Sequence, residues 1–314
     1  MGVFCLSPTD YDEFRPFYKR ACEIYHNVNL DKIKHRNDWD LSKVQGLPAD
    51  GKLDLTRIGL PGPLSIRVRT GRNLRKYNLP GAMTKEDRIN MEKELEAVFK
   101  KLIADPDFGG QYYSLTPGNP HQMSDETYDG LVKSHIMFKD MTSTMTLNTA
   151  GVAADWPYGR GCYVSEDKGF IIWVGEEDHL RIMCMKKGTV LNEVFDRLKK
   201  AIDVVEDLIP GGCIYSPEFG VVTSCPTNVG TGMRASVLLQ VPNLTKDGTE
   251  AKVKEICRPF GLSVRGSMGE HTPIGADGTV DISPKARFCI TEAEIVAALY
   301  KGVEQVWKAE QNAK

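Results

Sequence analysis

The spacing of apolar residues along the chain predicts a series of amphipathic helices. Residues 9–26 place aromatic and aliphatic side chains close to helical spacing, and Thr9 is a suitable N-cap. Residues 84–104 repeat this pattern after Thr84, with Asp87 at the position of a capping box. Further helices are predicted at 124–139, 189–209 and 249–258 and from about 291 to 308.

Alternating or short apolar runs predict strands between these helices. "LSIRVR" at 64–69 alternates, and the runs at 169–174 and 180–185 form a predicted hairpin around the turn "GEED". "FGVVTS" at 219–224 and "RASVLLQV" at 234–241 flank a polar loop, and "LSVRGS" follows the helix predicted at 249–258. Because hairpins and helices are interleaved, the predicted fold class is α+β, with a mostly antiparallel sheet flanked by helices.

Composition narrows the class of protein. The 314 residues are 41% hydrophobic and 26% charged with a net charge of −2, so no overall field attracts nucleic acid or anionic lipid. We find no run of 18 apolar residues and no leader-like start, and therefore expect neither a membrane span nor a signal peptide. The eight cysteines are scattered without a CxxC pair, which argues against a zinc site or disulfide framework and suits a reducing cytoplasm.

Arginines at predicted strand ends are the first candidate for chemistry. Arg67 and Arg69 stand at i and i+2, so on a strand both point to the same face. Arg181, Arg234 and Arg265 stand at or beside other strand ends, and the planar guanidinium fork matches phosphate oxygens. Five such groups near one spot would need a polyanion between them. For each arginine alone, a solvated surface pair is the alternative.

Two acids and a thiol are the second candidate. Glu177, in "GEEDHLR", can bind a cationic substrate or accept a proton, and Glu270 stands on the polar loop "GSMGEHT"; a solvated surface charge is the alternative for both. Cys225 lies in "SCPTNVGTGMRAS", where nearby cations and hydroxyl groups would lower the pKa of its thiol. It could be a nucleophile, an anionic partner for a cation, or an inert buried cysteine. No relay partner is evident, which weakens the first reading.

Six stretches together resemble the phosphagen (guanidino) kinases, the family of arginine, creatine and taurocyamine kinases. They occur in the family's order from about residue 64 to the C-terminus: "SIRVRTGR", "DWPYGRG", "WVGEEDHLRIM", "SCPTNVGTGMRAS", "VRGSMGEHT" and "DISPKARFCIT". The resemblance implies a glutamine-synthetase-like catalytic domain at 49–314, after a remnant of a small helical N-terminal domain plus linker at 1–48. The segment that precedes the substrate-specificity loop in the family is expected to be missing.

The resemblance also implies an activity and roles for residues. The activity is reversible transfer of the γ-phosphoryl group of MgATP to a guanidino nitrogen, with MgADP as product and Mg²⁺ held through phosphates and water, without protein ligands. Glu177 would bind the guanidinium and act as base, Glu270 would be the flap acid of arginine kinases, and Cys225 would sit against the guanidinium. The nucleotide would be bound by Ser65, Arg67, Arg69, Arg181, Arg234, Arg265 and His271.

Four positions depart from the family pattern. Val164 and Leu238 stand where arginine kinases usually have histidines, and both are expected near the nucleotide. Gly175 replaces an asparagine in the turn, and Met268 stands where arginine is frequent. Base-stacking or ribose contacts near Val164 and Leu238 are therefore expected to differ from those of other members, whereas a difference in guanidino selectivity is expected from the missing N-terminal segment.

L-Arginine is the predicted acceptor, because Glu270 supplies a second carboxylate. Taurocyamine, a protein arginine side chain, and a non-catalytic role in nucleotide binding are the alternatives. The expected partner is a small guanidino substrate, with no nucleic acid or membrane, and the chain is expected to be a monomer or a homodimer.

Overall fold

The computed structural model describes residues 2–266, 274 and 277–313 and divides into two compact units. Unit 1 contains Met1–His35, Thr70–Met183 and Lys200–Gly232. Unit 2 contains Arg36–Arg69, Cys184–Lys199 and Met233–Lys314. The domain boundary predicted between residues 48 and 49 stays a prediction.

The strands confirm the predicted α+β class. An eight-stranded antiparallel sheet has the order β2-β3-β4-β5-β1-β8-β10-β9, and β6 and β7 form a separate ribbon. The strands are β1 (Leu64–Arg72), β2 (Gly110–Ser114), β3 (Gly161–Ser165), β4 (Phe170–Val174), β5 (Leu180–Gly188), β6 (Tyr215–Ser216), β7 (Gly220–Val221), β8 (Met233–Gln240), β9 (Leu262–Gly266) and β10 (Thr279–Pro284).

Within unit 1, β2, β3 and β4 pair in sequence order, and every residue of β3 and β4 is buried. Helix α3 contacts β2 and begins at Thr84, whose side chain and that of Asp87 form the predicted capping box. These reciprocal bonds satisfy backbone N–H groups that a helix start leaves without partners. The helices of this unit are α1 (Asp10–Glu13), α2 (Arg15–His26), α3 (Lys85–Leu102), α4 (Asp125–Lys133) and α5 (Met145–Thr149).

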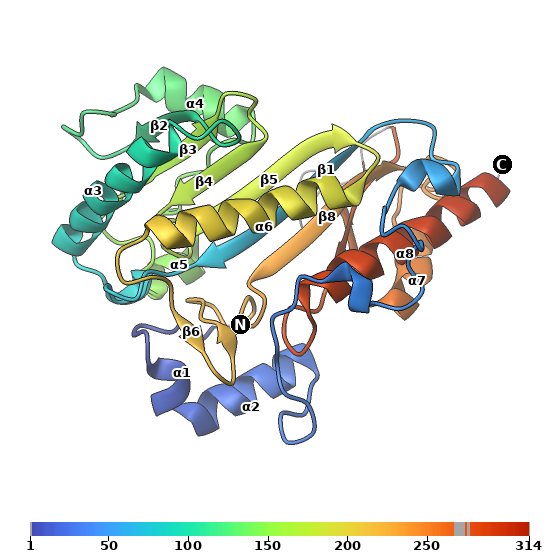
Figure 1. Ribbon diagram of the computed structural model, residues 1–314, viewed down its shortest axis with the longest axis horizontal. Coiled ribbons are helices and arrows are strands. Elements are labelled where there is room, and N and C mark those ends of the chain that lie inside the picture. Colours follow the sequence, from blue (N-terminus) through green and yellow to red (C-terminus); the bar gives the residue numbers. More distant parts are fainter. Residues whose placement is uncertain (1, 267–273, 275–276, 314) are drawn as a thin grey trace. The chain divides into compact units, whose positions relative to one another are not determined.

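Within unit 2, β8 and β9 alternate between buried and more exposed residues, and β10 does so up to Ile282, after which Ser283 and Pro284 are also buried. Helix α8 (Glu292–Asn312) contacts these three strands and lies along β8 in Figure 1. It begins with a second capping box, between Thr291 and Glu294. Helix α7 (Ala251–Cys257) packs against α8 and β9, and helix α6 (Leu191–Leu208) runs from this unit into unit 1.

Three predicted elements are corrected. The helix predicted at 9–26 is broken at Phe14 because Pro16, with no N–H, is tolerated only in the first turn of a new helix, α2. The side chain of Thr9 makes no capping bond. The helix predicted at 124–139 ends at Lys133, two residues before His135, whose φ of 59° is left-handed. Of the strand predicted at 219–224, only Gly220–Val221 forms a β-strand.

Candidate functional site

The turn that carries Glu177 lies between β4 and β5 in unit 1. It starts at Gly175, which has a φ of 70° and leaves no room for a side chain: a Cβ there would lie 2.4 Å from the Gly159 carbonyl oxygen. The buried Arg160 donates through Nε to the Gly175 carbonyl at 3.1 Å. This close packing leaves room only for glycine at position 175 of this chain.

Glu177 lies in a cluster of polar side chains. Its Oε2 accepts a hydrogen bond from Asn228 Nδ2 at 3.1 Å and is 3.4 Å from Arg181 Nη2. Arg181 also pairs with Glu176 at 2.9 Å. Burial alone would lower the pKa of Arg181, but the neighbouring carboxylates outweigh it and raise that pKa. Glu177 therefore contacts a guanidinium of its own chain.

Cys225 is buried in the same unit, with 5% of its surface exposed. Its Sγ lies 3.1 Å from Thr227 Oγ1. Burial raises the pKa of the Cys225 thiol, and the negative charge of Glu177 raises it further, while hydrogen bonds with Thr227 oppose this less strongly. The hydroxyl group of Thr227 lowers this pKa as expected, but the expected net lowering is wrong, because burial and the negative charge of Glu177 outweigh it.

The loop around Cys225 is also held by the N-terminal segment, which the sequence did not indicate. The Cys5 N–H donates to the Ser224 carbonyl at 2.8 Å, and the Tyr11 hydroxyl donates to the Thr223 carbonyl at 3.1 Å. His26 Nε2 lies 2.8 Å from the Pro226 carbonyl oxygen, which accepts. About 200 residues separate these partners in the chain, so no local pattern could reveal them.

The remaining described arginines of the prediction lie in unit 2. Arg67 and Arg69 of β1 are part-exposed and alternate with the buried Ile66 and Val68, as the sequence predicted. Strand geometry places Ser65, two residues before Arg67, on the same face of β1.

Strands β8, β9 and β10 carry two further arginines on one face. Arg234 pairs with Asp281 at 2.8 Å. Asp281 stands directly opposite Leu238 on β8 and Arg265 on β9, so these side chains share a face. Four predicted phosphate-binding arginines therefore belong to unit 2, and Arg181 belongs to unit 1 with Glu177 and Cys225.

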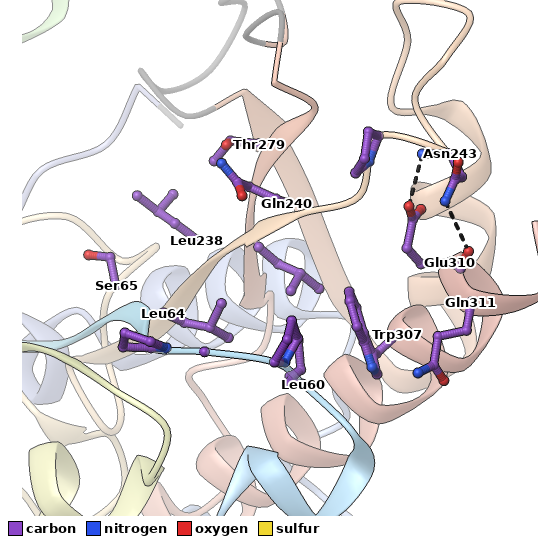
Figure 2. Close-up of a pocket in the computed structure, with 15 residues that line it drawn as sticks. Leu60, Leu64, Ser65, Leu238, Gln240, Asn243, Thr279, Trp307, Glu310 and Gln311 are labelled. Carbon is purple, nitrogen blue, oxygen red and sulfur yellow. Dashed lines mark hydrogen bonds between the residues drawn. The ribbon is translucent and has the colours of Figure 1, made fainter. Parts of the chain in front are cut away.

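Ser65 and Leu238 also line a pocket of about 510 Å³ in unit 2, shown in Figure 2. Leu60, Leu64 and Trp307 make its wall largely apolar. Among the described residues that line it, only Glu310 has an ionisable side chain, and its carboxylate accepts the N–H groups of Asn243 and Leu244, both at 2.9 Å. The pocket suits a neutral group.

The other positions singled out in the sequence contribute little to the description of the site. Val164 is buried in β3, opposite Gln111. Glu270, His271 and Met268 lie outside the described residues. In the part of the chain that the structure describes, no cluster of acidic, histidine and cysteine side chains could hold a metal ion. Across these same ranges, no helix has the length and apolar character needed to cross a bilayer.

Comparison with known proteins identifies the family. Residues 90–313 match the model of the ATP:guanido phosphotransferase C-terminal catalytic domain. The chain belongs to this family and is a phosphagen kinase.

Its relatives include an arginine kinase, Oct f 2, from Amphioctopus fangsiao, which is 35% identical over 318 residues, covering 100% of this chain and 84% of the relative. A taurocyamine kinase from Schistosoma mansoni is 38% identical over 289 residues, covering 91% of this chain and 36% of the relative.

Among solved structures, lombricine kinase superimposes with a TM-score of 0.83 at 28% identity, covering 99% of this chain and 81% of that one. The duplicated taurocyamine kinase from Schistosoma mansoni, with bound transition-state-analogue components, has a TM-score of 0.82 at 32% identity. This comparison covers 98% of our chain and 40% of that one.

Proposed function

We propose that the chain transfers the γ-phosphoryl group of MgATP reversibly to the guanidino group of L-arginine. The observation that carries the proposal is the cluster around Glu177, where an acid held by Asn228 already contacts a guanidinium, that of Arg181. A substrate guanidinium offers the same planar donors to the same carboxylate.

The chain's residues divide the chemistry between binding and proton transfer. Glu177 binds the guanidinium and accepts its proton, so that a neutral nitrogen attacks the γ-phosphorus. The N–P bond forms as the bond from the γ-phosphorus to the β–γ bridging oxygen breaks, and ADP leaves with that electron pair. Because such transfer depends mostly on alignment and charge neutralisation, arginines suit the phosphate-binding role.

Unit 2 supplies groups for the nucleotide. Arg67, Arg69, Arg234 and Arg265 concentrate positive charge on part-exposed strand positions, which favours triphosphate oxygens. The largely apolar pocket that Ser65 lines (Figure 2) accommodates the uncharged nucleoside part. Mg²⁺ arrives with the nucleotide as part of the substrate.

Taurocyamine is the second candidate acceptor. The observation that favours it is the 38% identity to the taurocyamine kinase from Schistosoma mansoni, against 35% to the octopus arginine kinase. Arginine is preferred because the sequences of arginine kinases match 100% of this chain, whereas that of the taurocyamine kinase matches 91% of it.

A coupled ADP-release assay with MgATP tests the proposal. The acceptors are arginine, taurocyamine, creatine, a protein rich in arginine, and none. We expect turnover with free arginine. Turnover with taurocyamine alone would show that taurocyamine, and not arginine, is the acceptor. Activity on the protein alone would indicate a protein-arginine kinase. No turnover despite ATP binding would refute catalysis.

A further inference from the structure

Asp178, which follows Glu177 directly, is a buried acid beside the cluster. Only 2% of its surface is exposed. Its Oδ1 accepts two hydrogen bonds, from the Ser224 N–H and from Asn73 Nδ2, both at 2.7 Å. Ser224 is the residue before Cys225. One carboxylate oxygen thus joins the turn of Glu177 to the loop of the thiol.

Asn73 completes this connection. Besides the bond to Asp178, its Nδ2 donates to the Val222 carbonyl at 3.1 Å, and its Oδ1 accepts the His179 N–H at 2.8 Å. The side chain of Asn73 is fully buried and bonds to both the turn and the loop. Asp178 and Asn73 therefore form a buried clamp between residues 178–179 and 222–224.

The fit around Asp178 is close. A Cβ on Gly71 would lie 2.7 Å from Asp178 Oδ2, so only a glycine at this position lets the carboxylate approach the strand. Burial raises the pKa of Asp178, while the bonds from Ser224 and Asn73 lower it and offset part of that rise.

We infer that Asp178 is a positioning residue: with Asn73, it fixes the distance between Glu177 and Cys225, and hence the site for a planar cation between an acid and a thiol. This inference rests on the proposed function, because it assigns Asp178 to the guanidino-binding cluster. Asp178 acts through its neighbours and is not itself proposed to touch substrate.

The test is the alkylation rate of Cys225 by iodoacetamide, followed by peptide mass spectrometry in the full chain. Asp178→Ala removes both hydrogen bonds and a negative charge that raises the pKa of Cys225. Loss of one charge-assisted bond corresponds to a factor of roughly ten in loop opening, so we expect alkylation at least about tenfold faster. Asp178→Asn keeps an acceptor oxygen and should restore most of the protection.

Glu92→Gln is the matched control. Glu92 is another buried acid of unit 1, with bonds from Tyr112, Ser114 and Thr116, and burial raises its pKa too. This variant should lose stability without changing the alkylation of Cys225. Kinetically, Asp178→Ala should raise the KM for the guanidino acceptor and lower kcat, with the KM for MgATP unchanged.

Alkylation needs no turnover, so this test stands even if no acceptor is phosphorylated. Equal alkylation rates in wild type, Asp178→Ala and Asp178→Asn would overturn the inference. So would faster alkylation in Glu92→Gln by the same factor, which would indicate general loosening. If Asp178→Ala does not fold, Asn73→Ala removes one donor to the same oxygen and should give the same direction of change.

Discussion

The groups that we propose to bind the two substrates are built differently in the two units. In unit 1, Glu177 and Cys225 lie on a turn and a loop, held by side-chain bonds from Asn228, Asp178 and Asn73. In unit 2, Arg67, Arg69, Arg234 and Arg265 lie on strands, where alternation sets the face to which they point. The first group depends on long-range hydrogen bonds and the second on backbone geometry. Substitutions in the unit 1 group should therefore reduce activity more than substitutions in the unit 2 group, and should disturb residues farther along the chain.

The largest expected effect is from Glu177→Gln, which keeps the shape of the side chain and removes its negative charge and its capacity as a base. We expect kcat to fall by at least about a hundredfold, the lower range for loss of a general base. The matched change in unit 2, Asp281→Asn, removes the negative charge that pairs with Arg234 and should mainly raise the KM for MgATP. Steady-state kinetics measure both. Equal losses of kcat in the two variants would contradict the proposed difference in role between the two units.

Acid should destabilise unit 1 through His179. This side chain is buried, its Nδ1 accepts the Leu74 N–H, and its Nε2 donates to the Asn78 carbonyl, so it is neutral. Burial lowers the pKa of His179 from 6.5 to about 4. The unfolded chain therefore binds this proton first as pH falls, and stability present above pH 6.5 is lost towards pH 4, by up to about 3 kcal/mol.

Urea denaturation at several pH values between 7 and 4, followed by tryptophan fluorescence, measures this loss. His179→Gln cannot titrate and should flatten the dependence over this window, although it is less stable at pH 7. An unchanged slope in the variant would show that other groups cause the acid sensitivity.

The smallest effect concerns the Cys225 thiol. Because burial and Glu177 raise its pKa, alkylation without substrate should have its midpoint above that of an ordinary thiol. A bound guanidinium favours the thiolate, so arginine should move the midpoint to lower pH, unless it also shields the sulfur completely. Cys289 of unit 2, whose pKa burial raises to about 11, is the control and should not respond to arginine.

The same contrast explains what the sequence could predict. The alternation in "LSIRVR" and "RASVLLQV" correctly predicted strands and the direction of their arginines, because direction on a strand is a local property. The capping box at Thr84 could also be predicted, since its two residues are three positions apart in the sequence. Strands β2, β3 and β10 were missed: "GQYYS" and "GCYVS" are short and begin with glycine, and "TVDISP" ends in proline.

The turn and loop of unit 1 were predicted only in part. The motifs marked Glu177 and Cys225, but nothing local indicated that Asn73, Tyr11 and His26 would support them. Nor could the direction of the Cys225 pKa shift be read from neighbouring residues, because burial is a property of the folded unit.

The central claim is that the turn–loop cluster of unit 1 binds the guanidino substrate and the arginine-bearing strands of unit 2 bind the nucleotide. Isothermal titration of Glu177→Gln and Arg234→Ala, each with MgATP and with arginine in separate experiments, tests it most directly. The account predicts that Glu177→Gln loses arginine binding and keeps MgATP binding, and that Arg234→Ala does the reverse. Loss of the same ligand in both variants, or unchanged binding of both ligands in either one, would contradict it.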